Sequence, residues 1–214
     1  ILTYSSKDAF RNAIEQLIAP VDFFIYNNFN RIGIKSIKLS IKRSALEYAF
    51  LDDITLLETR AVAGETIHLR VGITPYGQEK TYINIPVKLP VNLTTDIYSI
   101  YAANEYIYYY AERLFMPNKY KIRNLDDVMR IYGKSYDDKA LKVWLYSSSR
   151  GVQIGKDSFP SLPISRYGII ADNYTSDKSA VINAIEGEYN MPYSILGLMK
   201  IDIIIEGADK YENR

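Results

Sequence analysis

The sequence offers few side chains that could perform acid–base or nucleophilic chemistry. Its single histidine, His68, lies on the polar face of a predicted strand beside Arg70. A catalytic histidine needs an orienting acid and a nucleophile, and the spacing identifies neither. The run Ser147-Ser148-Ser149-Arg150-Gly151 lacks the Gly-x-Ser-x-Gly elbow of a hydrolase nucleophile. We therefore interpret His68 as a structural sheet residue and the serine run as a loop, and we expect no catalytic residue.

Metal and cofactor motifs are also missing from the sequence. Carboxylates occur in adjacent pairs at Asp52-Asp53, Asp126-Asp127 and Asp137-Asp138, and none lies in the spaced oxygen-ligand loop of a calcium site. With no cysteine and one histidine, the chain cannot build a thiolate or multi-histidine zinc site. It also lacks the glycine-rich loops that hold nucleotide phosphates. We expect no metal and no cofactor, and we assign the acidic pairs to bends, turns and helix caps.

Tyrosine is the outlier of the composition, with 20 residues against 7 Phe and 1 Trp. A tyrosine ring contributes buried area while its hydroxyl keeps a hydrogen bond to water or to a partner, so tyrosine suits half-wet sheet faces and interfaces. One predicted helix concentrates four tyrosines, which form the candidate interaction surface: Tyr106, Tyr108, Tyr109 and Tyr110. A ligand-binding aromatic platform is the alternative interpretation of these residues.

Length and charge limit the classes of partner. At 214 residues and 48% hydrophobic content, the chain can build one large or two small cores. Its net charge of +1 gives no field that would attract nucleic acid or an acidic membrane surface. Charges or turn residues interrupt every apolar run before the roughly 20 residues of a membrane span. We expect no nucleic-acid partner and no membrane insertion. Because the chain begins with Ile1, we also expect that a signal peptide or a preceding domain has been removed.

The clearest structural pattern is a β-hairpin with one buried face. Apolar residues occupy alternate positions from Ile67 to Ile73 and from Ile83 to Leu89, on either side of the turn residues Pro75-Tyr76-Gly77. Strands with one buried face are typical of sandwiches and barrels. Pro86 places the second strand at a sheet edge or at a bulge, because proline has no amide to donate to a ladder.

The segments before the hairpin predict a helix and two strand regions. Apolar residues at helical spacing predict a helix from Ser6 to Ala19, and Pro20 is expected to stop it. Alternation predicts strands in the region from Ile32 to Lys42 and in the region from Glu47 to Val62. The second region is expected to bend at Asp52.

The segments after the hairpin predict further strands mixed with helices. Strands are expected over Ile97–Tyr101, Ala140–Ser148, Val152–Ile154, Ala180–Tyr189 and Leu198–Glu206. Helices are expected over Ala102–Leu114 and Asn124–Gly133, and near Ile164 after the turn Pro160–Pro163. We therefore predict a mainly β fold with α: an N-terminal helix over 1–20, an immunoglobulin-like β-sandwich over 21–101, and a smaller α/β subdomain over 102–214.

Five segments of the hairpin and the region after it resemble a known family: Val62-Ala63-Gly64-Glu65-Thr66, Pro75-Tyr76-Gly77, Ile85-Pro86, Asn124-Leu125-Asp126-Asp127 and Pro160-Ser161-Leu162-Pro163. The resemblance covers about Ile32 to Gly207 and is to the region that follows the peptidase domain in bacterial SpoIVB-type serine peptidase-like proteins. Ala63 stands where that family usually has proline, and the family's Gly-x-Ser-Gly-Ser nucleophile loop with an upstream histidine is absent. The resemblance therefore implies a non-catalytic region.

From the resemblance and the composition we expect an extracytoplasmic module of the periplasm, the cell envelope or the secreted fraction. It would accompany a peptidase-like domain and bind a protein partner or present a substrate, using sheet edges and tyrosine-rich faces. Three alternatives stay open. The chain could contribute substrate-binding residues to a hydrolase whose serine and histidine lie upstream, polymerise as a structural homo-oligomer through its strand edges and tyrosine-rich surfaces, or bind carbohydrate on its tyrosines.

Overall fold

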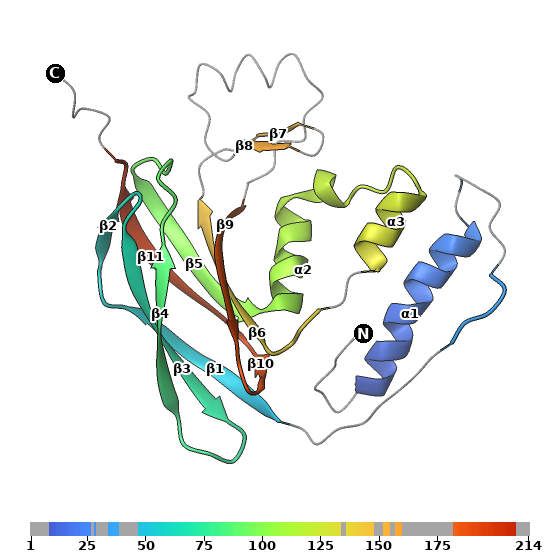
Figure 1. Cartoon of the computed structure of the whole chain (residues 1–214), viewed down its shortest axis with the longest axis horizontal. Helices are drawn as coiled ribbons and strands as arrows, with labels where there is room; N and C mark the ends of the chain where they lie inside the picture. Colours follow the sequence, from blue (N-terminus) through green and yellow to red (C-terminus); the bar gives the residue numbers. More distant parts are fainter. Residues whose placement is uncertain are drawn as a thin grey trace.

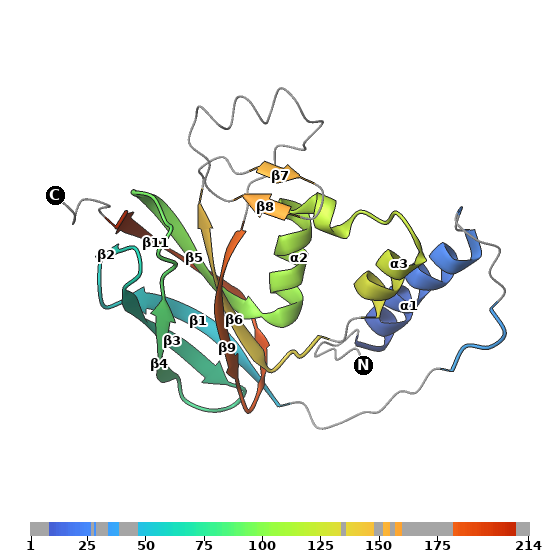
Figure 2. The ribbon, with the colours of Figure 1, turned by 45° about the horizontal axis from the view of Figure 1, so that its top comes forward.

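The computed structural model of the chain describes residues 9–26, 28, 34–38, 47–133, 136–147, 152–154, 157–159 and 182–208. Over these residues the fold is mainly β, with two curled sheets and a separate two-stranded hairpin (Figure 1). In both Figure 1 and Figure 2 the three α-helices lie on one side of the two sheets. The helices that the structure describes therefore cover one side of the sheets.

The four-stranded sheet contains the predicted hairpin and has the strand order β10-β1-β3-β4. Strand β3 pairs antiparallel with both β1 and β4, and β10 pairs parallel with β1. The β1–β3 register shifts between Leu51 and Asp53, where the sequence predicts a bend. The bounds of the strands are β1 Tyr48–Leu56, β3 Thr66–Pro75, β4 Thr81–Lys88 and β10 Ser194–Leu196.

The five-stranded sheet has the order β2-β11-β5-β6-β9. Its neighbouring strands are antiparallel except for β2 and β11, which pair in parallel. The bounds are β2 Arg60–Val62, β5 Asp96–Asn104, β6 Ala140–Ser147, β9 Ile182–Asn190 and β11 Leu198–Glu206. The separate hairpin joins β7 (Val152–Ile154) to β8 (Asp157–Phe159).

The chain passes between the two sheets at two places. Strands β1 and β10 pair in parallel in the four-stranded sheet. The strands that follow them in the chain, β2 and β11, pair in parallel in the five-stranded sheet. Gly197 makes the second passage with a φ of +116°, and a Cβ atom at this position would lie 3.2 Å from the carbonyl oxygen of Leu51. Glycine satisfies both the left-handed backbone and the close approach of β1.

A single apolar cluster draws its buried side chains from both sheets. Alternation along β3 puts every second side chain into this cluster, and its partner β4 does the same. The predicted hairpin with one buried face is confirmed. The largest fully buried members of the cluster are Tyr98, Ile67, Leu69, Ile73, Ile85, Leu89, Ile100, Leu141, Leu145, Ile195 and Ile203.

Asparagine side chains begin two of the helices. The Oδ1 of Asn104 accepts the Ile107 amide at 2.9 Å, and the Oδ1 of Asn124 accepts the Asp127 amide at 2.9 Å. Asn104 also donates to the Ile195 carbonyl at 2.8 Å, which ties the start of its helix to β10. The helices are α1 Ala9–Tyr26, α2 Glu105–Phe115, the 3-10 helix η1 Pro117–Tyr120 and α3 Leu125–Tyr132. Within the part of the chain that the structure describes, no helix is both long and apolar enough to cross a membrane.

Two predicted helix boundaries are wrong. Ala102 and Ala103 were expected to begin a helix, but they are fully buried in β5, where pairing with β11 and β6 outweighs the helix propensity of alanine. Pro20 was expected to end the first helix, but α1 continues through it to Tyr26. The residues beyond the proline include Phe23, whose ring lies 6.5 Å from Tyr132 of α3, and this packing favours the longer helix.

Other expectations fall partly or wholly outside the described residues. Residues 34–38 of the strand region predicted from Ile32 to Lys42 lie in neither helix nor strand, and the rest of it is not described. The turn Pro160–Pro163 and the helix near Ile164 also lie outside the described residues. The boundary expected at residue 101 falls inside β5, and strands from both sides of it pair in both sheets. The sequence carries no local pattern for these long-range pairings.

The double role of Asn104 gives a stability prediction. Replacing it by alanine removes both the cap of α2 and the buried bond to β10, so we expect a loss of about 2 kcal/mol in the free energy of unfolding. Asn124→Ala is the matched control, because it removes a cap alone and should cost about 1 kcal/mol. Urea unfolding of both variants measures the difference. Equal losses would show that the Asn104–Ile195 bond adds nothing.

Candidate interaction surface

The four tyrosines proposed as an interaction surface do not share one environment. Tyr108 points to the five-stranded sheet, where its ring meets Trp144 edge-on at 5.3 Å. Trp144 is 1% exposed and stacks on Tyr101 at 5.4 Å. Burial raises the pKa of the Tyr108 hydroxyl, and the nearby Glu112 carboxylate raises it further. Tyr108 therefore belongs to the aromatic packing that holds α2 on the sheet, and it is not free to contact a partner.

Tyr109 is half-buried against the segment that follows α3. Its ring lies 5.3 Å from Tyr136, and Tyr106 meets the same ring edge-on at 5.9 Å. The amide of Asp137 donates to Glu105 Oε2 at 2.7 Å, which fixes this segment to the first turn of α2. Burial is the main cause that raises the pKa of both Tyr109 and Tyr136. These contacts leave Tyr109 mainly a packing residue.

The exposed side of α2 consists of Tyr106, Tyr110 and Leu114, which we call the α2 stripe. Their spacing of four residues places them on one side of the helix. They are 44%, 58% and 63% exposed, respectively. The predicted surface is therefore divided, because Tyr106 and Tyr110 lie on the stripe and Tyr108 and Tyr109 lie beneath or beside it. Tyr106 and Tyr110 belong to the predicted interaction surface. Leu114 does not, but it lies on the same side of the helix as these two residues.

A buried carboxylate fixes η1 against α2. The side chain of Glu112 is 6% exposed and accepts hydrogen bonds from Lys119 Nζ at 2.6 Å and from the Tyr120 hydroxyl. Burial raises the pKa of Tyr120, and its hydrogen bond to Glu112 raises it further. The guanidinium of Arg113 lies 5.3 Å from the centre of the Tyr120 ring. Because a buried charge is costly without partners, this cluster holds the end of α2 in one arrangement.

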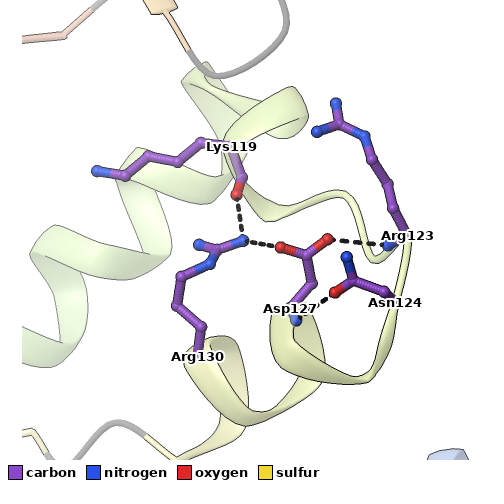
Figure 3. Close-up of polar contacts among 5 residues, drawn as sticks. All are labelled: Lys119, Arg123, Asn124, Asp127 and Arg130. Carbon is purple, nitrogen blue, oxygen red and sulfur yellow. Dashed lines mark hydrogen bonds and ion pairs between the residues drawn. The ribbon is translucent and has the colours of Figure 1, made fainter.

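A second buried carboxylate organises the start of α3 (Figure 3). Asp127 accepts the backbone amide of Arg123 at 3.1 Å and the guanidinium of Arg130 at 2.9 Å. Arg130 also donates to the Lys119 carbonyl at 3.1 Å, so it connects α3 to η1. Together with the Asn124 cap, these bonds confirm the structural interpretation of Asp127, and Asp126 lies beside it in the first turn of α3. The contacts of Glu112 and those of Asp127 do not resemble an acid–base pair around an open site.

His68 has a partner that the sequence did not identify. Glu58 accepts the His68 amide at 3.0 Å and lies 3.1 Å from its Nδ1. Strand β1 has ended at Leu56, and the Leu57 amide donates to the His68 carbonyl. The Glu58 carboxylate thus accepts the His68 amide in place of a backbone carbonyl of β1. The amide and imidazole of His68 hold the pKa of Glu58 below its usual value. Within the described residues, no hydroxyl or amine hydrogen-bonds to His68.

The other candidate groups have structural contacts. Asp52 bonds to Thr74, and Asp53 to Lys80, on the outer face of the four-stranded sheet. One buried carboxylate oxygen of Asp138 has no hydrogen-bond partner in the described residues. Those residues contain no group of three or more His, Asp or Glu side chains that could hold a metal ion. Ser147 ends β6, and the run after it lies outside the described residues.

No protein-family model, curated protein or solved structure matches this chain. The similarity to the SpoIVB-type peptidase-like proteins therefore stays a prediction from the residues that carry it.

The division of the tyrosines predicts opposite outcomes for neighbouring substitutions. Tyr108→Ala removes a ring packed on Trp144 and should lower the free energy of unfolding by about 3 kcal/mol. Tyr110→Ala, two residues away on the α2 stripe, should change it by less than about 0.5 kcal/mol. Thermal and urea unfolding measure both values. Similar effects for the two variants would contradict the assignment of Tyr108 to the core side of α2.

The Glu58–His68 pair predicts a pH-dependent contribution to stability. Because the folded pKa of Glu58 lies below its usual value of 4.5, the ionised carboxylate stabilises the fold above pH 4.5. This contribution is lost as the pH falls through the lowered pKa. We expect Glu58→Gln to cost about 0.5 kcal/mol at neutral pH, an amount suited to an exposed pair, and to cost nothing in strong acid. Glu79→Gln, in the exposed turn of the same hairpin, is the control. A Glu58 effect that is independent of pH would contradict the pairing.

Proposed function

We propose that the chain is a non-catalytic extracytoplasmic module that binds a protein partner and accompanies a peptidase-like domain. The observation that carries the proposal is the α2 stripe, in which Tyr106, Tyr110 and Leu114 are all exposed on one side of a short helix. Exposed aromatic and aliphatic side chains in one continuous row are typical of contact surfaces between proteins. Isolated apolar residues on a surface would carry no such implication.

The support under the stripe favours binding. Tyr108 and Trp144 pack α2 onto the sheet, and Glu112 fixes the helix end through Lys119. A contact surface that is already rigid loses little conformational freedom on association, which favours affinity. The stripe thus has the rigid base that a binding helix needs.

The environment of His68 supports a binding role more than a catalytic one. Its Nδ1 faces Glu58, and no nucleophile lies beside it among the described residues. The pair closes the end of the β1–β3 ladder, so a structural role accounts for both side chains. The alternative in which an upstream serine and histidine complete a hydrolase requires only binding residues from this chain, and it is compatible with the same stripe.

A β-sandwich is the architecture that we propose for the module. Its support is the shared core, to which both curled sheets contribute their inward faces. The immunoglobulin-like order of strands stays a prediction, and so does the extracytoplasmic location, which rests on the family resemblance.

The two other functions are less well supported. Carbohydrate binding on the helix would need an open platform, but Tyr108 packs on Trp144 and Tyr109 packs on Tyr136. Polymerisation through β2 would need that strand to have a free edge. At the β2 edge, the Val62 amide is occupied by the Glu65 carboxylate at 2.8 Å. Protein binding through the α2 stripe needs neither an open aromatic platform nor a free strand edge.

Site-specific photo-cross-linking in the cells that make the protein tests the proposal. A photoreactive phenylalanine analogue at position 110 should give an adduct with a cell-envelope protein. The additional change Leu114→Ser should reduce the yield of this adduct at least fivefold, because it removes the apolar contact at the end of the stripe. Position 55, an exposed threonine on the outer face of β1, is the control and should give no such adduct.

Two outcomes would contradict the proposal. One is the same adduct pattern at positions 110 and 55, since contact would then not depend on the stripe. The other is casein hydrolysis by the purified chain that disappears in His68→Ala, because this would make the chain catalytic.

A further inference from the structure

The edges of the two sheets differ in how far their backbone groups are occupied. At the β10 edge, the Ile195 amide donates to the Asp138 carbonyl and the Ile195 carbonyl accepts from Asn104, both at 2.8 Å. At the β2 edge, Glu65 takes the Val62 amide. These contacts occupy the outward backbone groups of Ile195 in β10 and the amide of Val62 in β2. The edge at β4 has a different arrangement.

The register fixes which backbone groups of β4 face outward. The amide and carbonyl of His68 bond to Glu58 and Leu57 on the β1 side, so they point away from β4. His68 is opposite Pro86, which makes this a non-hydrogen-bonded pair of the antiparallel ladder. Such pairs recur at every second residue. The backbone groups of Tyr82 and Asn84, opposite Gly72 and Arg70, therefore also point out of the sheet.

Only one part of this edge is closed. Pro86 has no amide, and its carbonyl accepts the Tyr189 hydroxyl of β9 at 2.7 Å. The outward amides and carbonyls of Tyr82 and Asn84 have no hydrogen-bond partner in the described residues. Pro86 is thus confirmed as an edge-strand proline, and the four backbone groups before it stay open.

The side chains around the open groups limit what can bind there. Ile83 lies between them and is only half-buried against the core. Lys88 is exposed at the far end of the strand, and the described residues provide it with no acidic partner. Lys80 lies just before the strand and is paired with Asp53. An incoming strand would meet an apolar side chain at its centre and the positive charge of Lys88 at one end.

We propose that an extended segment of a protein partner, with apolar and acidic residues in alternation, adds as a strand beside Tyr82 and Asn84 of β4. This inference rests on the proposed function as a protein-binding module and names the chemistry of its partner. The outward amides and carbonyls supply the main-chain bonds of strand addition. An apolar side chain of the segment covers Ile83, and an acidic side chain meets Lys88.

A second copy of this chain is a poorer occupant of the same edge. Lys88 beside this open edge disfavours pairing of the edge with itself, because both copies carry its positive charge. The missing amide and the occupied carbonyl of Pro86 would also remove bonds from both strands of a symmetric pair. A foreign segment with acidic residues avoids the repulsion.

Titration of the isotope-labelled full chain with a short synthetic peptide of alternating valine and glutamate tests the inference by NMR. We expect the largest amide shifts at Tyr82, Ile83 and Asn84. The peptide is also made with methyl groups on the backbone nitrogens of either the valines or the glutamates, and the version that removes the donors facing the edge should bind at least tenfold more weakly. Before any peptide is added, the amides of Tyr82 and Asn84 should exchange with solvent faster than those of Ile83 and Ile85.

Asn84→Pro provides the matching change in the protein. It removes an outward amide that the β3 ladder does not use, and the residue before it is already extended, so the fold should persist. We expect at least tenfold weaker peptide binding, while Asn84→Ala, which keeps the amide, should bind like the unchanged chain. If Asn84→Pro does not fold, the methylated peptide still decides the question.

Three results would overturn the inference. They are equal binding of the plain and methylated peptides, shifts that map to the α2 stripe instead of β4, and a dimer in sedimentation that Asn84→Pro abolishes. The last result would assign the edge to a second copy. Cross-linking separates failure here from failure of the proposed function. Adducts at position 110 without peptide binding at β4 would contradict only strand addition, whereas absence of adducts at both 110 and 84 would contradict both.

Discussion

The alternation of side chains along β3 is the constraint on which the rest of the structure depends. Every second residue enters the core shared by the two curled sheets, so the intervening residues and their backbone groups must face outward. The same parity directs His68 toward Glu58 and leaves Tyr82 and Asn84 open at the β4 edge. A register shift of one residue would exchange the two sets and expose the core.

The position of α2 depends on the five-stranded sheet. The outer side of the five-stranded sheet presents Tyr101 and Trp144, and α2 covers them with Tyr108. Once that side of α2 is committed to packing, the opposite side must be exposed, and there it carries the α2 stripe. The Glu112 and Asp127 clusters then connect α2, η1 and α3 through Lys119. Packing beneath the helix and the exposed stripe above it are thus two consequences of one amphipathic segment.

Local patterns in the sequence predicted the elements whose physics is local. Strict alternation identified the hairpin and β11, and Asn124 with the acidic residues after it identified α3. The misplaced start of α2 has a non-local cause, because Ala102 and Ala103 are held in β5 by strands that lie far away in the sequence. The parallel pairs β1–β10 and β2–β11, the Glu58–His68 contact and the burial of Tyr108 likewise depend on long-range packing. Four tyrosines within five residues do not reveal which of them the sheet will cover.

The central claim is that the chain binds a protein through the exposed side of α2, while the buried side only supports it. Hydrogen–deuterium exchange of the full chain, measured with and without its cross-linked partner, tests this claim most directly. The account predicts that the partner slows exchange across Glu105–Phe115 and leaves the outer face of β1 unchanged. Unchanged exchange throughout α2, with protection elsewhere on the molecule, would contradict it.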